Sequence, residues 1–215
     1  MTLFSSGGGH SLRWGAALIA LSAWAGTFLH LQLMIDRTHG DVMAAIWHQA
    51  DFFSETTNLY AAIVFSLAAL RVIHMVDRRL LGGIALAEFL VMSLYWTLLY
   101  ARSPPPPEGV LSNLMVHLIT PLSVCIYIVA AARPGRTLWT DPFSWAIYPL
   151  CYLIYAEVRG ALDGHYPYYF IDAGKLGIAG VVAVTLAISI GFLAAGLAVT
   201  AFDRRGRSRA SALAR

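Results

Sequence analysis

The chain has 215 residues, of which 58% are hydrophobic and only 13% are charged, and its formal net charge is +3. A soluble domain carries about a quarter of charged residues, so the composition excludes an ordinary water-soluble protein. The small excess of Arg sits in short loops and a tail, so we expect no nucleic-acid partner. In lipid the backbone must satisfy its own hydrogen bonds, which leaves helices or a closed barrel. Because the apolar segments are long continuous runs, the sequence predicts an all-α polytopic membrane protein, with residues 1–215 forming a single domain.

Six apolar segments approach or exceed the roughly 20 residues that a helix needs to cross a bilayer. They span residues 12–35, 51–75, 80–101, 110–132, 142–158 and 175–202. Pro149 interrupts the fifth segment, and Pro121 predicts a kink in the fourth. The sequence therefore predicts a bundle of six transmembrane helices.

Basic residues are unequally divided between the two sides of this bundle. One side carries most of the arginines, namely Arg13, Arg78, Arg79, Arg133, Arg136, Arg204, Arg205, Arg207, Arg209 and Arg215. Cytoplasmic loops of membrane proteins are enriched in Lys and Arg. Both termini are therefore predicted to lie in the cytoplasm.

Polar side chains gather in the outer half of the predicted bundle, although ionisable groups are costly at membrane depth. Ser54 and Asn58 lie on one face of the second helix, because residues three or four apart are neighbours on a helix. Asn113 and His117 share a face of the fourth helix in the same way. A hydroxyl becomes a nucleophile when a nearby His accepts its proton. The pattern predicts a Ser54–His117 dyad that opens to the outer side.

Other polar residues surround this predicted dyad. A carboxylate such as Asp51 or Glu55 could orient the His or stabilise its cation. The expected supporting or oxyanion-stabilising residues are Asn58, Asn113, Thr57 and Asp51. The alternative interpretation is that His117 only bonds a neighbouring helix within a structural polar layer.

A metal site is a rival interpretation of the same region. The eligible ligands are His30, Asp51, Glu55, His117, Glu157 and His165. No compact His-x-x-x-His or Cys-x-x-Cys motif accompanies them, so we predict no metal and no other cofactor. In the inner part of the third helix, Glu88 could form a structural ion pair with Arg71, and a proton path is the alternative.

Aromatic residues are dense in the outer loop between the fifth and sixth segments. We expect Tyr166, Tyr168 and Phe170 of this loop, together with Trp96 of the third helix, to line the substrate site. An aromatic belt at the membrane interface is the other explanation.

Several motifs, taken in order, resemble a bacterial six-helix membrane family related to the androgen-induced and androgen-dependent TFPI-regulating proteins. The segment DFFSETTNL, residues 51–59, resembles the F-F-T-x-x-S-N-L motif of that family. The segment NLMVHLITPL, residues 113–122, resembles N-x-x-x-H-x-x-x-P, and residues 145–155 and 166–172 resemble its later signatures.

The eukaryotic members are threonine hydrolases that cleave fatty acid esters of hydroxy fatty acids. The resemblance implies that His117 is the catalytic His, and it places Ser54 where the family has Thr. Thr56 and Thr57 stand beside it as alternative nucleophiles. The resemblance also implies a lipid or fatty-acyl ester substrate and a multi-pass location in a bacterial inner membrane.

Two functions therefore compete at this stage. The first is an intramembrane hydrolase in which Ser54 attacks an ester and His117 is the general base. The second is a non-enzymatic protein that binds or transports an ion, a metal or a lipid.

Overall fold

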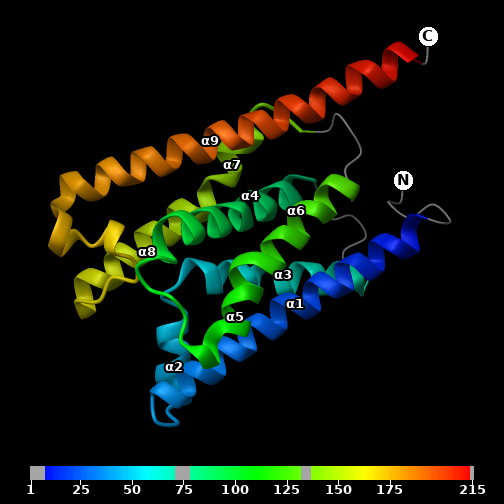
Figure 1. Ribbon diagram of the computed structural model, residues 1–215. Coiled ribbons are helices and arrows are strands. Elements are labelled where there is room, and N and C mark those ends of the chain that lie inside the picture. The colour runs from blue at the N-terminus through cyan, green and yellow to red at the C-terminus, as the bar shows by residue number, and fades with distance from the viewer. Residues whose placement is uncertain (1–7, 71–77, 132–136, 214–215) are drawn as a thin grey trace. The chain divides into compact units, whose positions relative to one another are not determined.

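The computed structural model describes residues 8–70, 78–131 and 137–213 (Figure 1). Every regular element within these ranges is a helix, which confirms the all-α prediction. The contacts divide the chain into two compact units, Met1–Ala132 and Arg133–Arg215.

The first unit contains the helices α1 to α6. These are α1 (Gly8–Arg37), α2 (Val42–Gln49), α3 (Phe53–Ala69), α4 (Arg78–Leu94), α5 (Val110–Leu114) and α6 (Thr120–Ala131). A π-helical turn η1 (Tyr95–Leu99) continues α4, and a second one, η3 (Met115–Ile119), joins α5 to α6. A 3₁₀ turn, η2 (Pro107–Gly109), precedes α5.

The second unit is built from α7 (Asp141–Trp145), α8 (Ile147–Asp163), η4 (Tyr169–Ile171) and α9 (Ala173–Leu213). The start of α9 is capped by Asp172, whose carboxylate accepts a hydrogen bond from the Lys175 N–H at 3.1 Å. Near the other end of the helix, the Asp203 carboxylate accepts hydrogen bonds from the backbone and hydroxyl of Thr137. Gly177 has a left-handed φ of 67°, which interrupts the first part of α9.

Four helical stretches are long and apolar enough to cross a membrane, namely residues 11–37, 80–99, 107–130 and 173–205. They correspond to the first, third, fourth and sixth predicted segments. In the other two segments, α3 and α8 each have 17 described residues, or about 26 Å of helix at the usual rise per residue. That is shorter than the hydrocarbon core of about 30 Å. Residues 71–75 of the second segment lie outside the described residues, so six spans and cytoplasmic termini stay predictions.

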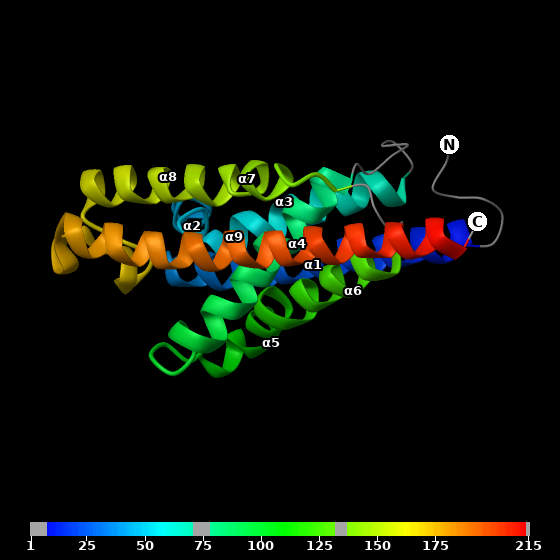
Figure 2. The ribbon, with the colours of Figure 1, turned by 90° about the horizontal axis from the view of Figure 1, so that it is seen from above.

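The core of the first unit lies between α1, α3, α4 and α6. Small residues such as Ala16, Ala20 and Ala61 bring the helix backbones together, as is typical of helix contacts in lipid. Phe65 packs edge-on against Tyr127 with ring centroids 5.2 Å apart. Along its length α1 contacts α3, α5, η3 and α6, and Figure 2 shows the α5–α6 segment crossing α1 obliquely. This packing brings the polar first turn of α3 into the same unit as the η3 turn.

Candidate active site

His117 lies in the η3 turn with its imidazole ring fixed on two sides. Its Nδ1 is 3.1 Å from the Asn113 carbonyl oxygen, and its ring stacks on Tyr95 with centroids 3.7 Å apart and planes 19° apart. A carbonyl oxygen can only accept, so the geometry assigns the ring proton to Nδ1 and leaves a lone pair on Nε2. This is the tautomer that a general base requires.

Pro121 explains why two carbonyl groups of the η3 turn bond to other helices. Proline has no N–H, so it cannot close the usual helical bond to the carbonyl of His117, four residues earlier. The Thr120 N–H reaches Met115 instead of Val116, which is the π-helical pattern. The Val116 carbonyl accepts a hydrogen bond from Asn58 Nδ2, and the His117 carbonyl accepts one from Trp96 Nε1, both at 3.1 Å. Side chains of α3 and η1 therefore set the position of this turn.

Ser54 lies in the first turn of α3 and is 7% exposed. The hydroxyls of Thr56 and Thr57 donate to the Phe53 carbonyl of their own helix, at 3.1 and 2.7 Å. Within the described part of the chain, the Ser54 hydroxyl forms no hydrogen bond, either with its helix or with His117. Catalytic hydrogen bonds are often long before substrate binds. Of these three hydroxyls, Ser54 is thus the one that its own helix does not engage.

Asn58 links the helix of Ser54 to the turn of His117. Its amide nitrogen donates to the Ser54 carbonyl at 2.9 Å and to the Val116 carbonyl at 3.1 Å, and the side chain is fully buried. Because both amide hydrogens are engaged, an oxyanion role for Asn58 would require one of these bonds to break. Its supporting role needs no such change. The Asn113 side chain lies near the Tyr95 hydroxyl, which has no hydrogen-bond partner among the described residues.

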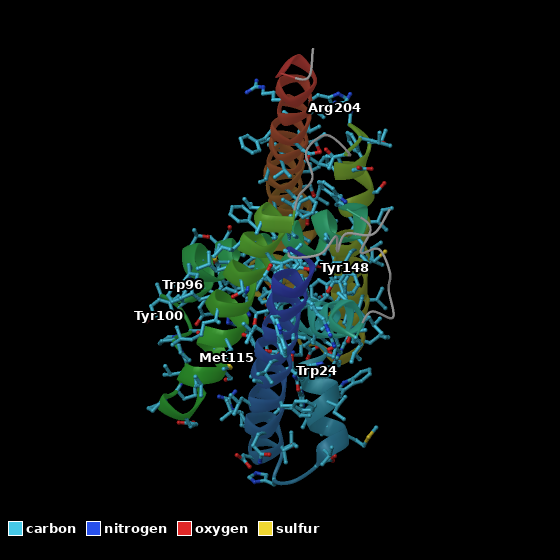
Figure 3. The ribbon with its side chains drawn as sticks, turned by 90° about the vertical axis from the view of Figure 1, so that its right-hand side faces the viewer. Trp24, Trp96, Tyr100, Met115, Tyr148 and Arg204 are labelled. Atoms are coloured by element: carbon cyan, nitrogen blue, oxygen red, sulfur yellow. The ribbon has the colours of Figure 1, made fainter. Side chains whose placement is uncertain are left out.

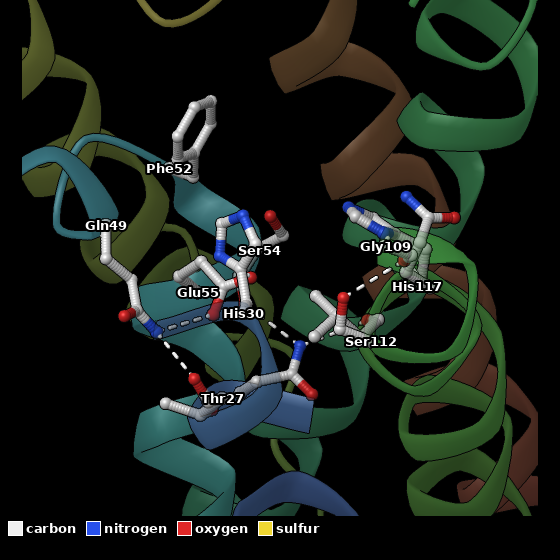
Figure 4. A network of polar contacts seen from close by, with 12 residues as sticks. Thr27, His30, Gln49, Phe52, Ser54, Glu55, Gly109, Ser112 and His117 are labelled. Atoms are coloured by element: carbon white, nitrogen blue, oxygen red, sulfur yellow. Dashed lines mark hydrogen bonds and ion pairs between the residues drawn. The ribbon is translucent and has the colours of Figure 1, made fainter. Parts of the chain in front are cut away.

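A second cluster of polar side chains, beside Ser54, links α1, α2 and α3 (Figure 4). His30 Nδ1 lies 2.8 Å from Glu55 Oε1, an ion-pair distance, although the ring N–H is not aligned as in a hydrogen bond. Gln49 Nε2 donates to Glu55 Oε2 and to the Thr27 carbonyl, both at 3.0 Å. The sequence predicts Glu55 as one of two carboxylates to orient His117, whereas the structure places this carboxylate against His30.

Gln49 was missed by the sequence analysis. It lies in a short helix between two apolar segments, and its partners are a carboxylate and a backbone carbonyl on other helices. No spacing within the sequence marks such a contact. The one available signal was the polar run around Asp51, which is itself 3% exposed.

The alternative metal ligands are spread over both units. Among the described residues, no three His, Cys, Asp or Glu side chains gather as a metal site. His30 and Glu55 are in contact, and His30 is close enough to His117 for an electrostatic interaction. Glu157 and His165 belong to the second unit.

The aromatic residues predicted to line the site also divide between the units. Trp96 is 38% exposed and bonds the His117 carbonyl, and Figure 3 shows it projecting beside Tyr100. In the second unit, Tyr168 stacks on Phe170 with centroids 5.2 Å apart, and Tyr166 packs directly on Gly160. The place of Tyr166, Tyr168 and Phe170 over the substrate stays a prediction.

Near this loop, Arg159 is buried and donates to the Tyr155 hydroxyl at 2.7 Å and to Asp163 at 3.4 Å. The backbone N–H of His165 bonds the Asp163 carboxylate, and this bond, with the help of Arg159, lowers the pKa of Asp163. The carboxylate thus stabilises the turn that follows α8.

Comparison of the chain with known protein families, with curated proteins and with solved structures gives no significant match, so its function is argued from the site alone.

Proposed function

We propose that this protein is an intramembrane hydrolase of fatty-acyl or lipid esters, with Ser54 as the nucleophile and His117 as the general base. The observation that carries the proposal is the fixed imidazole of His117. Its Nδ1 is bound to a carbonyl and its Nε2 is left as an acceptor, in the same unit as a buried Ser54 hydroxyl that its helix does not engage. We further propose six transmembrane helices with both termini in the cytoplasm.

The reaction would begin when Ser54 Oγ attacks the ester carbonyl and its proton moves to His117 Nε2. The tetrahedral intermediate carries a negative oxygen, for which the Asn113 amide is the candidate donor. The bond from the acyl carbon to the alcohol oxygen then breaks, the alcohol leaves with a proton from a protonated histidine of the site, and an acyl group remains on Ser54. Water attacks this acyl-enzyme, releases the fatty acid and restores the Ser54 hydroxyl.

The surroundings of His117 support this role. Stacked aromatic pairs contribute about 0.5–1.5 kcal/mol beyond their buried area, so Tyr95 restrains rotation of the imidazole. The Asn113 carbonyl fixes the tautomer. A general base held in one orientation needs no rearrangement when the substrate arrives.

The test is covalent labelling of the purified protein in detergent with an alkyl fluorophosphonate, with the labelled residue mapped by mass spectrometry. Wild type is expected to be labelled at Ser54, and Ser54→Ala and His117→Gln are expected to lose labelling and ester hydrolysis together. Ser54→Thr is expected to keep activity, because Thr carries the same nucleophilic oxygen.

Thr57→Val is the matched control, because it removes a buried hydroxyl one helical turn away from Ser54. Labelling that survives Ser54→Ala but disappears in Thr57→Val would move the nucleophile to Thr57. Full activity in both Ser54→Ala and His117→Gln would refute the dyad.

A second candidate function, binding of a proton or a cation inside the bundle, is favoured by Glu88. This residue of α4 is fully buried, and neither carboxylate oxygen has a hydrogen-bond partner among the described residues. Its predicted partner, Arg71, lies outside the described residues. Ionisable groups buried at membrane depth often mark ion or proton pathways. Proton or sodium flux in proteoliposomes that disappears in Glu88→Gln, without any ester hydrolysis in wild type, would favour this function.

A further inference from the structure

We propose that the two histidines of the site divide the proton transfers, with His117 as the base for Ser54 and His30 as the acid for the leaving alcohol. This inference rests on the proposed hydrolase function and adds a residue to it. In the sequence, His30 stands out only as an alternative metal ligand.

The two imidazoles have different chemical surroundings. His117 Nδ1 faces a neutral backbone carbonyl, and its ring lies on Tyr95. His30 Nδ1 lies 2.8 Å from the Glu55 carboxylate, and the Glu55 side chain is only 4% exposed. A carboxylate stabilises a positive imidazole far better than a carbonyl does, because the interaction joins two full charges in a site with little water. We therefore assign the acid role to His30, whose ring faces the carboxylate, and the base role to His117, whose ring faces the carbonyl.

The Glu55 carboxylate is itself held in place. Gln49 donates one hydrogen bond to Glu55 Oε2 and another to the Thr27 carbonyl. Thr27 lies three residues before His30 on α1, so Gln49 connects the helix of the imidazole to the helix of the carboxylate. Both oxygens of Glu55 are engaged, one by Gln49 and one by His30. Glu55 and Gln49 are positioning residues in this scheme.

The position of Ser54 suits two proton-transfer groups. Ser54 precedes Glu55 in α3, and in the view of Figure 4 its side chain is drawn between His30 and His117. The two histidines are also close enough to interact electrostatically. His30 uses Nδ1 for Glu55, which leaves Nε2–H to donate.

The proton balance closes over one turnover. In acylation, Ser54 gives its proton to His117 Nε2, the bond from the acyl carbon to the alcohol oxygen breaks, and that oxygen takes a proton from His30 Nε2. In deacylation, the attacking water gives a proton to His30, and the departing Ser54 oxygen takes one from His117. The products are one acid and one alcohol, and both histidines return to their starting states.

The experiment compares two esters of the same fatty acid, one with p-nitrophenol and one with a simple alkyl alcohol. The p-nitrophenolate leaves without an acid, whereas an alkoxide needs one. General acid catalysis contributes about 10²–10⁴-fold. In His30→Gln and Glu55→Gln, acylation by the alkyl ester is therefore expected to fall at least about 100-fold more than acylation by the p-nitrophenyl ester, measured in single turnovers.

His48→Gln is the matched control, because it changes an exposed histidine beside Gln49. It is expected to leave the ratio of the two rates unchanged. Circular dichroism and gel filtration are used to check that each variant is folded. If His30→Gln and Glu55→Gln slow acylation by both esters equally, the acid role is overturned and His30 is structural. If they slow acylation by neither ester, the acid role is overturned as well. Both results would leave the hydrolase proposal intact, provided that wild type is labelled at Ser54. A wild type that is not labelled would refute the hydrolase function first.

Discussion

Replacement of Asn58 by Leu tests whether the η3 turn is held by α3. Leu has the same branched heavy-atom skeleton as Asn, so no cavity forms, and the change replaces the amide oxygen and nitrogen by two bulkier methyl groups. Asn58 donates to the carbonyls of Ser54 and Val116 and is fully buried. The Ser54 carbonyl keeps its helical bond from the backbone N–H of residue 58. The Val116 carbonyl loses its donor, because the Thr120 N–H is directed to Met115 and Pro121 has none.

The expected cost follows from this difference between the two carbonyls. A hydrogen bond contributes about 0.5–1.5 kcal/mol, and a buried acceptor left without a partner costs about 1–3 kcal/mol. The greater burial of apolar Leu surface offsets a part of this. Asn58→Leu is therefore expected to lower the free energy of unfolding by about 2–3 kcal/mol.

The assay is reversible unfolding in mixed micelles with increasing SDS, followed by circular dichroism. Thr97→Val is the matched control, since the Thr97 hydroxyl donates to Ser93 within its own chain segment at 2.6 Å and is exposed. It is expected to change the free energy of unfolding by less than about 0.5 kcal/mol. Fluorophosphonate labelling of Ser54 is expected to fall in Asn58→Leu alone. If Asn58→Leu were as stable as Thr97→Val, the hydrogen bond from Asn58 would not hold the η3 turn in place.

Three further changes have expected outcomes. Tyr95→Leu removes the ring under His117, so it is expected to lower the free energy of unfolding by about 0.5–1.5 kcal/mol and to slow ester hydrolysis. Tyr95→Phe keeps the ring and is expected to keep both the stability and the rate. Unfolding and hydrolysis assays measure the two effects. Glu88→Met removes a buried carboxyl that has no hydrogen-bond partner among the described residues. It is expected to raise the free energy of unfolding by about 1–3 kcal/mol. A melting temperature below that of wild type would contradict this expectation. The Lys175 side chain, more than the backbone N–H groups, lowers the pKa of Asp172, so the stability from this cap is present at neutral pH and is lost as pH falls below about 3.9. The difference in melting temperature between wild type and Asp172→Ala is therefore expected to close in acid.

Hydropathy sufficed to predict the helices that are long and apolar. The structure has helices of spanning length in four of the six predicted segments. The others are shorter helices: α3 begins with buried polar residues, and α8 is preceded by a separate helix, α7. Hydropathy counts apolar residues and does not find where a helix begins or breaks.

The position of the polar residues was predictable where one helix carries the whole pattern. The spacing of Ser54 and Asn58 gave a shared face, and both residues are buried there. Pro121 was expected to kink its helix, but the two π-helical turns and the rotation of His117 onto Tyr95 depend on neighbouring helices. The contact of Glu55 with His30 rather than His117 has the same origin, because it depends on how α1 rotates against α3.

The freed carbonyls of η3 have a consequence for biogenesis. A chain entering a bilayer forms its helices one by one before they associate. The turn that carries His117 is completed by an amide from α3 and an indole from η1, so no single inserted segment holds the imidazole in place. The arrangement around His117 therefore forms only at a late step, when α3, η1 and η3 have packed together.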